Sequence, residues 1–411
     1  MKKKIVVIGP CLSQSGYGEQ TRFALRSLRS KEDLFDIYIQ PIPWGKTGWV
    51  WEQSEFREWM DQRITETQVL IQRNQLHVDI SLQVTIPNEW KKVAPINIGY
   101  TAGIETTKVS PQWLPKGNEM DKILVVSNHA KTTYENTTAM ARNNQTGEEF
   151  AYKLETPVEV VHETTERTTP EDIDLPLDYD FNFLTLSQWS PRKNFKNTIQ
   201  WWVEEFIDQE VGLIVKTNTI GNNLMDRNHT NRVIKNLLDK YPDRKCKVYL
   251  LHGDLSAGQM TSLYNNDRVK ALINISHGEG FGLPLFEAAR EALPVITTGW
   301  SGQLDFLQHD GKDYFQNVEF TLQPVQREAV WPGVIEGDSM WAYADQGSYK
   351  MKLRKTYKNW AACKQTATEL AAILDEKFSE EKLMTGFCDT IYKPDPEFLA
   401  WMQELEELDE D

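Results

Sequence analysis

Short apolar runs alternate with longer segments of helical spacing along most of the chain. In the first half the runs occupy residues 5–8, 35–40, 78–85, 96–101, 122–127 and 158–161. In the second half they occupy residues 181–186, 211–217, 246–251, 269–275 and 294–299. Helical spacing covers residues 19–29, 128–142, 195–208, 285–290, 341–359 and 366–378. Runs of this length and β-branched content predict buried strands, so the alternation predicts an α/β protein.

A polar and acidic segment, residues 163–180, separates the two series of predicted strands. Such a segment is typical of a connection between domains. We therefore predict a first domain over residues 1–165, a linker over 166–180 and a second domain over 181–379. Two Asp-x-Asp pairs lie in the linker rather than at a strand end, so we predict no metal site there.

The most informative stretch runs from residue 269 to residue 307. A buried strand is followed by Gly278, Gly280 and Gly282, and then by a helix. Glycines let the backbone approach a ligand closely, and the free N–H groups at the helix start favour an anion. Glu279 lies in the loop and Glu287 lies on the helix, where carboxylates can accept hydrogen bonds from sugar or ribose hydroxyls.

These residues resemble a known donor-site motif. Glu279-Gly280-Phe281-Gly282-Leu283-Pro284, with Glu287 completing a Glu-x7-Glu pair, is similar to the motif of retaining GT-B glycosyltransferases, particularly glycosyltransferase family 4. The resemblance implies two Rossmann-like domains that face each other across a deep cleft. It implies transfer of a hexose from a nucleotide-sugar to an acceptor hydroxyl with retention, without an obligatory metal. It also implies that C-terminal helices, about 380–411, pack back on the first domain.

The resemblance also assigns roles to single residues. Glu287 is expected to bind the donor ribose, and Glu279 the transferred sugar. Lys193 matches a lysine that holds the donor diphosphate, whereas Gln188 stands where relatives have an arginine, so Arg192 is the candidate for the second cation. Glu105 occupies a loop where many relatives have a histidine. The other expected donor contacts are Gly280, Phe281, Gly282, Leu283, Lys216, Gly16, Tyr17 and Gly18.

Composition narrows the remaining choices. The 411 residues carry a net charge of −15, which disfavours a nonspecific polyanion binder. The four cysteines are far apart and form no Cys-x-x-Cys pair, which is typical of reduced thiols in a cytoplasmic protein. No apolar run reaches the roughly 20 residues of a membrane span. Three tryptophans, Trp44, Trp49 and Trp51, lie in the loop after the second strand, where we expect them to pack against the domain.

Several alternatives stay open at this point. The nucleotide can be UDP, GDP or ADP. The acceptor can be a glycan, a lipid-linked sugar, a protein or a modified nucleic-acid base. A nucleotide-sugar 2-epimerase, a phosphorylase or a non-enzymatic binding module would use the same scaffold. Since Gly9, Gly16 and Gly18 do not give the spacing Gly-x-Gly-x-x-Gly, we expect no nicotinamide or flavin cofactor.

Overall fold

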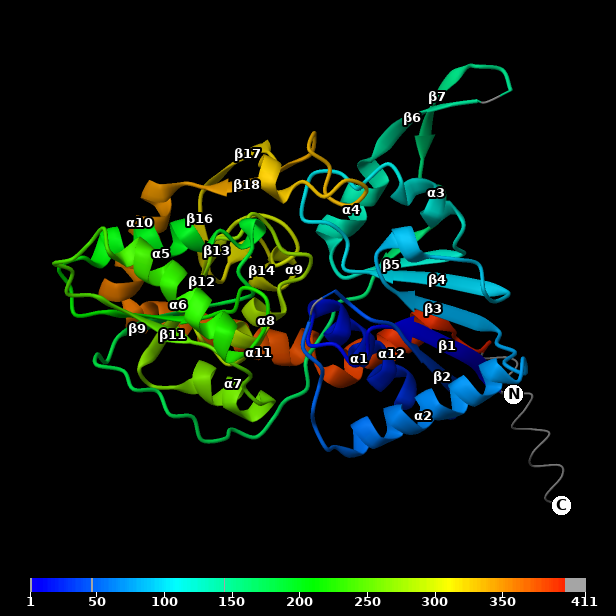
Figure 1. Ribbon diagram of the computed structural model, residues 1–411, viewed down its shortest axis with the longest axis horizontal. Coiled ribbons are helices and arrows are strands. Elements are labelled where there is room, and N and C mark those ends of the chain that lie inside the picture. The colour runs from blue at the N-terminus through cyan, green and yellow to red at the C-terminus, as the bar shows by residue number, and fades with distance from the viewer. Residues whose placement is uncertain (1, 46, 144, 396–411) are drawn as a thin grey trace.

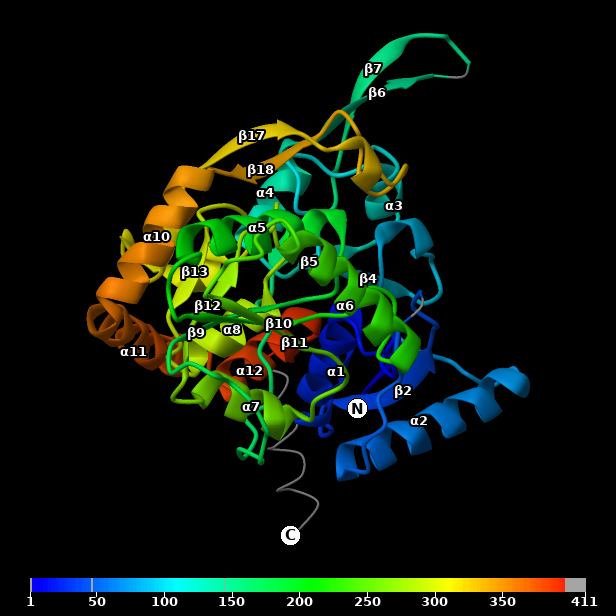
Figure 2. The same ribbon diagram turned by 60° about the vertical axis from the view of Figure 1, so that its left-hand side comes forward.

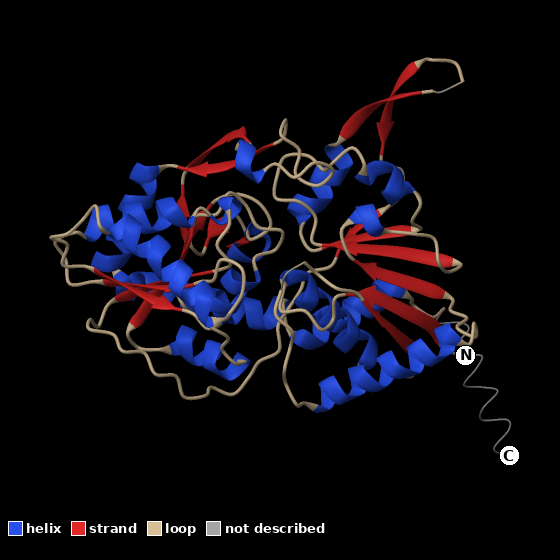
Figure 3. Cartoon of the chain, in the orientation of Figure 1, coloured by secondary structure: helices blue, strands red, loops and turns tan. Residues whose placement is uncertain are grey.

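The computed structural model describes residues 2–45, 47–143 and 145–395 and shows an α/β chain with two Rossmann-like domains. Each domain is built on a six-stranded sheet whose neighbouring strands are all parallel, and the two sheets lie side by side along the molecule (Figure 1). The prediction of the fold class is therefore confirmed. Helices cover the sheets and loops gather between the domains (Figure 3).

The first domain has the strand order β2-β1-β3-β4-β5-β8. Its strands are β1 (Lys3–Gly9), β2 (Phe35–Pro41), β3 (Ile80–Val84), β4 (Ile96–Thr101), β5 (Lys122–Val125) and β8 (Val158–Val160). Its helices are α1 (Gly16–Arg29), α2 (Glu55–Gln72), α3 (Trp113–Asn118) and α4 (Asn128–Asn136), with a 3-10 turn at Pro87–Glu89. The central strands are buried on both faces, because helices pack on each side of a parallel sheet.

The second domain has the strand order β11-β10-β9-β12-β13-β16. Its strands are β9 (Asn182–Leu186), β10 (Gly212–Lys216), β11 (Lys247–Leu251), β12 (Val269–Asn274), β13 (Val295–Thr298) and β16 (Gln316–Val318). Its helices are α5 (Phe195–Phe206), α6 (Leu224–Leu238), α7 (Ala257–Asn265), α8 (Leu283–Arg290), α9 (Leu304–Leu307), α10 (Gln346–Lys358) and α11 (Trp360–Lys377), with 3-10 turns at Pro191–Lys193 and Arg327–Ala329.

The order of the second sheet fixes where a ligand can bind. β9 and β12 are neighbours at the centre of this sheet. The strands that follow β9 in sequence lie on one side of this pair and those that follow β12 lie on the other, so the order of the strands reverses here. In open α/β sheets, a crevice forms outside the carboxyl ends of the strands at this reversal. The loops that follow β9 and β12 carry Lys193 and Glu279 respectively, so the topology brings two distant parts of the sequence together.

Within the described part of the chain, three antiparallel pairs of strands lie outside the main sheets. They are β6 (Thr138–Arg142) with β7 (Glu149–Lys153), β14 (Gln308–His309) with β15 (Lys312–Asp313), and β17 (Phe320–Pro324) with β18 (Met340–Ala344). The β6–β7 ribbon projects away from the first domain in both views (Figures 1 and 2). The loop between β17 and β18 returns to the first domain, where Gly333 accepts a hydrogen bond from the Trp113 indole at 3.0 Å.

Two predicted helices are wrong in part. The helix predicted over residues 128–142 ends at Asn136, and residues 138–142 form β6. Helix α4 ends because the backbone of Thr137 is extended. The chain then forms a hairpin in which β6 pairs with β7, and Gly147 has a positive φ in the turn between them. The helix predicted over residues 341–359 begins only at Gln346, because the Asp345 side chain caps its start and residues 340–344 form β18.

The last described helix, α12 (Glu380–Ile391), returns to the first domain and packs against α1. Its Cys388 thiol lies 3.0 Å from the Ser27 carbonyl oxygen, and the Phe387 ring contacts Phe23 and Tyr100. The remainder of the predicted C-terminal segment, residues 396–411, lies outside the described residues. Among the described helices, none is long and apolar enough to cross a membrane.

The predicted linker, residues 166–180, has no helix or strand and lies against the second domain. The Arg268 guanidinium donates hydrogen bonds to the carbonyl oxygens of Leu175 and Leu177, at 3.0 and 3.1 Å. Asp178 of the second Asp-x-Asp pair forms an ion pair with Lys247 at 2.8 Å. Within the described ranges, no group of His, Cys, Asp and Glu side chains could hold a metal ion.

Candidate active site

The glycine-rich loop after β12 packs directly against the first domain. A Cβ atom on Gly278 would lie 2.8 Å from Glu105 Cβ, and one on Gly280 would lie 2.6 Å from the Ala102 carbonyl oxygen. Gly282 begins α8 with φ of 98°, a conformation that favours glycine. Gly278 and Gly280 therefore let the loop lie against residues 102–105 of the other domain, while Gly282 allows the turn into α8.

Glu279 is the most strongly held carboxylate of this loop, and only 5% of its surface is exposed. Both of its oxygens lie 2.7 Å from the Lys193 ammonium, and Arg192 lies 3.2 Å away. The side chains of Asn274 and Ser276 each donate a further hydrogen bond at 3.0 Å. Burial alone would raise the pKa of Glu279, but Lys193 and Arg192 outweigh it and lower the pKa to about 2. The carboxylate is therefore ionised at neutral pH.

Arg192 connects this carboxylate with one from the first domain. Its guanidinium lies 3.0 Å from Glu105 and also donates to the Gly278 carbonyl oxygen at 2.7 Å. Burial opposes its charge, but the carboxylates of Glu105 and Glu279 raise the pKa of Arg192 above its usual value. Arg192 therefore points into the site, and Lys193, Arg192, Glu279 and Glu105 form what we call the charge cluster, with two positive and two negative groups.

Glu105 reaches the cluster from the loop after β4. Its carbonyl oxygen accepts a hydrogen bond from the Trp300 indole at 3.2 Å, and the Trp300 ring lies against His129. Trp300 follows β13 of the second domain. The cluster is thus assembled from three strand-end loops, and two domains contribute to it.

The structure places Glu287 away from the charge cluster. Its carboxylate accepts a hydrogen bond from the Tyr264 hydroxyl at 2.9 Å, and no described hydrogen bond or ion pair joins it to Lys193 or Arg192. Burial raises the pKa of Glu287 to about 7, and the nearby carboxylate of Glu19 acts in the same direction. Burial therefore favours the neutral form of Glu287, in contrast to Glu279.

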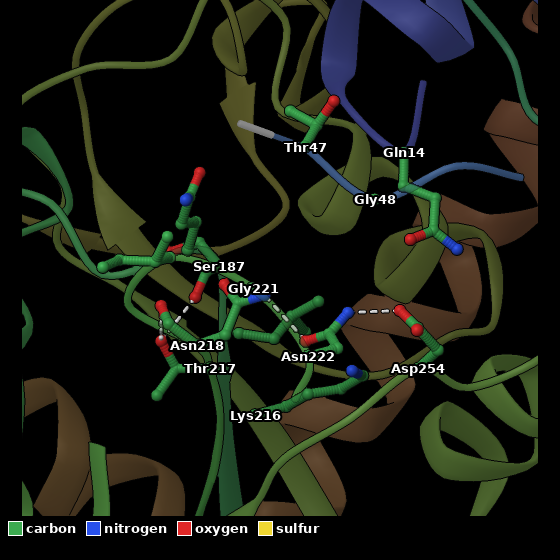
Figure 4. A pocket seen from close by; sticks show the side chains of 13 residues that line it. Gln14, Thr47, Gly48, Ser187, Lys216, Thr217, Asn218, Gly221, Asn222 and Asp254 are labelled. Atoms are coloured by element: carbon green, nitrogen blue, oxygen red, sulfur yellow. Dashed lines mark hydrogen bonds between the residues drawn. The ribbon is translucent and has the colours of Figure 1, made fainter. Parts of the chain in front are cut away.

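A separate pocket lies between the strand-end loops of the second domain and two loops of the first, those after β1 and β2 (Figure 4). Its volume is about 260 Å³. Lys216 and Gln188 both line it, and the Lys216 ammonium donates to the Gly253 carbonyl oxygen at 2.9 Å. Burial lowers the pKa of Lys216. The remaining lining residues are Gln14, Thr47, Gly48, Leu186, Ser187, Thr217, Asn218, Ile220, Gly221, Asn222 and Asp254.

A buried hydrogen-bonded pair holds one wall of this pocket. Asp226 accepts hydrogen bonds from the backbone N–H groups of Thr219 and Ile220, both at 3.0 Å, and lies 2.9 Å from His252 Nε2. Burial opposes its ionisation, but the hydrogen bonds from His252 and Thr219 lower the pKa of Asp226 below its usual value. Sequence reasoning did not assign this pair, or the amide side chains of Gln14 and Asn222, to a site. The available signal was that residues 217–223 follow a buried strand, as the other site loops do.

Gly16, Tyr17 and Gly18 form the start of α1. The Ser15 hydroxyl caps this start by accepting a hydrogen bond from Gly18 N at 3.1 Å. The Tyr17 hydroxyl lies 2.7 Å from Thr101 Oγ1, and its ring lies 4.4 Å from that of Trp44. These three residues do not line the described pocket, which the neighbouring Gln14 does.

Comparison with known proteins finds no matching family model and no matching curated sequence. Solved structures do match. Anabaena HepE, in complex with UDP and glucose, is 13% identical with a TM-score of 0.61, over 94% of this chain and 99% of its own. Sucrose-phosphate synthase from Thermosynechococcus elongatus is 12% identical with a TM-score of 0.63, over 95% and 98%. A glycosyltransferase from Rickettsia africae is 13% identical with a TM-score of 0.60, also over 95% and 98%. The fold is therefore the GT-B fold of glycosyltransferases.

Proposed function

We propose that this protein is a glycosyltransferase that moves a hexose from a nucleotide-sugar to an acceptor hydroxyl, with retention at the anomeric carbon. The observation that carries the proposal is the charge cluster. Two cations and Glu279 meet at the carboxyl ends of β9 and β12, beside a glycine-rich helix start, within a GT-B fold. Such a place suits a ligand that combines a diphosphate with a sugar. The resemblance of the Glu-x7-Glu motif supports retention.

UDP is the nucleotide that we favour. HepE was solved with UDP-glucose, and an Escherichia coli trehalose-6-phosphate protein of the same fold was solved with UDP-2-fluoro glucose, at a TM-score of 0.56 and 10% identity. We assign the donor to the second domain, residues 181–379, and the acceptor to the first, residues 1–165 with the C-terminal helix. No obligatory metal is part of the proposal, and we place the protein in the cytoplasm.

In this proposal the cations stabilise the leaving group. The bond between the anomeric carbon and the phosphate oxygen breaks with its electron pair, so the nucleoside diphosphate gains negative charge. Lys193 and Arg192 would then exchange part of their contact with Glu279 for contact with the diphosphate. The acceptor oxygen forms the new bond on the same face of the sugar, and its proton passes to the departing phosphate oxygen on that face. The charge developing on the sugar favours a nearby carboxylate, which Glu279 and Glu105 supply.

The remaining roles follow from position. The backbone N–H groups at the start of α8, next to Gly282 and Leu283, favour the diphosphate, and the buried Phe281 ring packs on Phe286 and Phe306. Glu287 would bind the ribose hydroxyls. The 260 Å³ pocket that contains Lys216 is the other part of the donor site.

A binding screen tests the proposal directly. Isothermal titration calorimetry with UDP, GDP, ADP and their hexose conjugates should show one preferred nucleotide, which we expect to be UDP. Incubation with donor and acceptor pools, followed by NMR of the product, should show an anomeric centre of unchanged configuration. If no nucleotide bound, the glycosyltransferase proposal would be wrong. Conversion of the donor alone to a 2-epimer would instead favour the epimerase.

A further inference from the structure

Two tryptophans between β2 and α2 are exposed to solvent. Trp51 is 88% exposed and Trp49 is 58% exposed, whereas Trp44 packs on Tyr17. The expectation that all three pack against the domain is therefore wrong for Trp49 and Trp51. Two large indoles exposed two positions apart in the chain leave apolar surface in water, and such a surface is typical of a binding site for a ligand or partner.

The backbone that carries these indoles is held firmly. Gly48 O accepts a hydrogen bond from Gln14 N at 2.9 Å, and Val50 N donates to Leu12 O at 3.0 Å. The Thr47 hydroxyl lies 2.6 Å from the Ser13 hydroxyl. These contacts tie the segment to the loop after β1, so the indoles are presented from an ordered backbone. A surface arranged in advance loses little conformational entropy on binding.

A hollow of about 510 Å³ lies beside Trp51 at the start of α2. Its one cation, Arg57, is already paired, because its Nε lies 3.0 Å from each carboxylate oxygen of Asp61. The carboxylates of Glu52 and Glu58 leave the hollow with net negative charge, and Gln53 adds an amide. This charge repels phosphate and sulfate groups, and carboxylates accept hydrogen bonds from hydroxyl groups.

An indole face, hydroxyl acceptors and negative charge together select a neutral sugar. The C–H groups on one face of a pyranose ring carry partial positive charge and pack on an electron-rich indole. The hydroxyl groups around the ring edge can donate to Glu52 and Glu58. Nucleic acid and lipid diphosphates fit poorly, because each would bring phosphates next to the carboxylates of Glu52 and Glu58.

The hollow also lies in a useful place. Thr47 and Gly48 line the pocket between the domains, and Trp49 is the next residue (Figure 4). Helix α2 begins on the side of the first domain that faces the second (Figure 1). A linear glycan that rests on Trp49 and Trp51 can therefore extend toward the cleft.

We infer that Trp49, Trp51 and the hollow beside them form an acceptor subsite for a neutral glycan chain, held by a sugar unit remote from the hydroxyl that reacts. This inference rests on the proposed glycosyltransferase function and specifies the acceptor class. The subsite binds through ring stacking and hydroxyl donation, and it excludes anionic acceptors by charge.

The test is glycan binding by the full chain, with nucleotide binding measured in parallel. The wild-type protein is applied to an array of neutral, sulfated and phosphorylated oligosaccharides, and the best neutral tetrasaccharide is titrated by saturation-transfer NMR. We expect Trp51→Ala and Trp49→Ala each to weaken that binding at least tenfold, and Trp51→Tyr to retain part of it. The matched control is Trp331→Ala, which removes an indole that is 57% exposed elsewhere in the second domain and should change nothing.

Calorimetry with UDP separates the two proposals. If UDP binds to all variants alike while Trp51→Ala loses the glycan, both stand. If UDP binds but no neutral glycan does, or if glycan binding survives Trp51→Ala and Trp49→Ala, the subsite is refuted and the proposed function is untouched. Retention of a sulfated or phosphorylated glycan through Trp51 would refute the neutral class. If UDP does not bind while glycans bind through Trp51, the glycosyltransferase proposal fails, and with it the acceptor role of the subsite.

Discussion

Glu279 and Glu287 belong to one sequence motif, eight positions apart, yet the fold gives them opposite surroundings. Glu279 accepts hydrogen bonds from Lys193, Arg192 and two neutral side chains, and its pKa is lowered to about 2. Among the described residues, Glu287 accepts its hydrogen bond from Tyr264, and burial raises its pKa to about 7. The difference arises from neighbours rather than from residue type.

The comparison separates the roles of the two carboxylates. Glu279 is a fixed negative charge within a neutral set of two cations and two anions, so a diphosphate can bind only by exchanging partners with it. Glu287 lies apart from those cations, and its carboxyl group can gain or lose a proton when a ligand binds. The spacing of seven residues puts one carboxylate in the loop and the other on α8, which is why the same residue type has different neighbours at the two positions.

We expect the largest loss of turnover when Lys193, the strongest partner of Glu279, is replaced. Lys193→Ala should reduce turnover by ~100-fold or more, by analogy with the loss of one preorganised donor to a developing anion. Because the leaving diphosphate is more negative in the transition state, UDP binding should weaken less than turnover, and UMP binding should change least. Steady-state kinetics and calorimetry measure these quantities. Full activity in Lys193→Ala would show that the diphosphate site lies elsewhere.

Removing the carboxylate of Glu287 tests the other half of the comparison. Glu287→Ala should weaken UDP binding by about 1–3 kcal/mol, because two ribose hydroxyls lose their acceptor. Uridine should lose as much affinity as UDP, since the contact is to ribose. Glu279→Gln is the matched control, and it should lower turnover more than uridine binding. Equal loss of uridine binding in both variants would mean that the two assignments need to be exchanged.

The two pKa values also predict opposite effects of pH on stability. The raised pKa of Glu287 contributes stability that is fully present below its ordinary value of 4.5 and is lost as pH rises through about 7. The lowered pKa of Glu279 contributes stability that is present above 4.5 and is lost as pH falls toward 2.

Urea unfolding at pH 5 and pH 8 measures the first of these contributions. The Glu287→Gln variant should lose less stability than the wild-type protein between the two pH values, by about 2 kcal/mol. Glu163, whose burial raises its pKa to about 8, contributes in the same direction in both proteins and therefore cancels in the comparison. An unchanged pH dependence in Glu287→Gln would contradict the raised pKa of Glu287.

The sequence predicted those helices and strands that show a clear local pattern of apolar and polar residues. The strands of both sheets were predictable because their apolar runs are buried on two faces. Helix α2 was missed because only Met60, Ile64 and Thr67 of its residues are buried, which leaves a weak apolar stripe. The β6–β7 ribbon was missed because its residues are mostly exposed and show no alternation of apolar and polar positions.

The site depends on contacts that no local pattern contains. Lys193 meets Glu279 across 86 positions of sequence because β9 and β12 are neighbours in the sheet. The resemblance pointed to both residues, but their direct ion pair and the contact between Arg192 and Glu105 required the folded chain. The raised pKa of Glu287 likewise depends on how deeply α8 is buried, which the motif does not specify.

We expect the smallest loss of turnover when the ion pair between Arg192 and Glu105, which joins the two domains, is broken. Arg192 lies between Glu105 and Glu279, so it completes the charge cluster without being the main partner of Glu279. Arg192→Ala should lower turnover by less than Lys193→Ala does, since the two contacts of 2.7 Å from Lys193 to Glu279 remain. Glu105→Gln keeps the length of the side chain but removes its charge.

A double-mutant cycle on turnover gives the coupling between these two residues. We expect about 1 kcal/mol, within the range for charged side chains in contact. Lys108→Ala with Asp338→Ala is the control cycle, because that exposed pair also joins the two domains but lies outside the charge cluster, and it should show less coupling. Additive losses from Arg192→Ala and Glu105→Gln would mean that Glu105 acts on the substrate by itself, and that the ion pair between the domains only positions its loop.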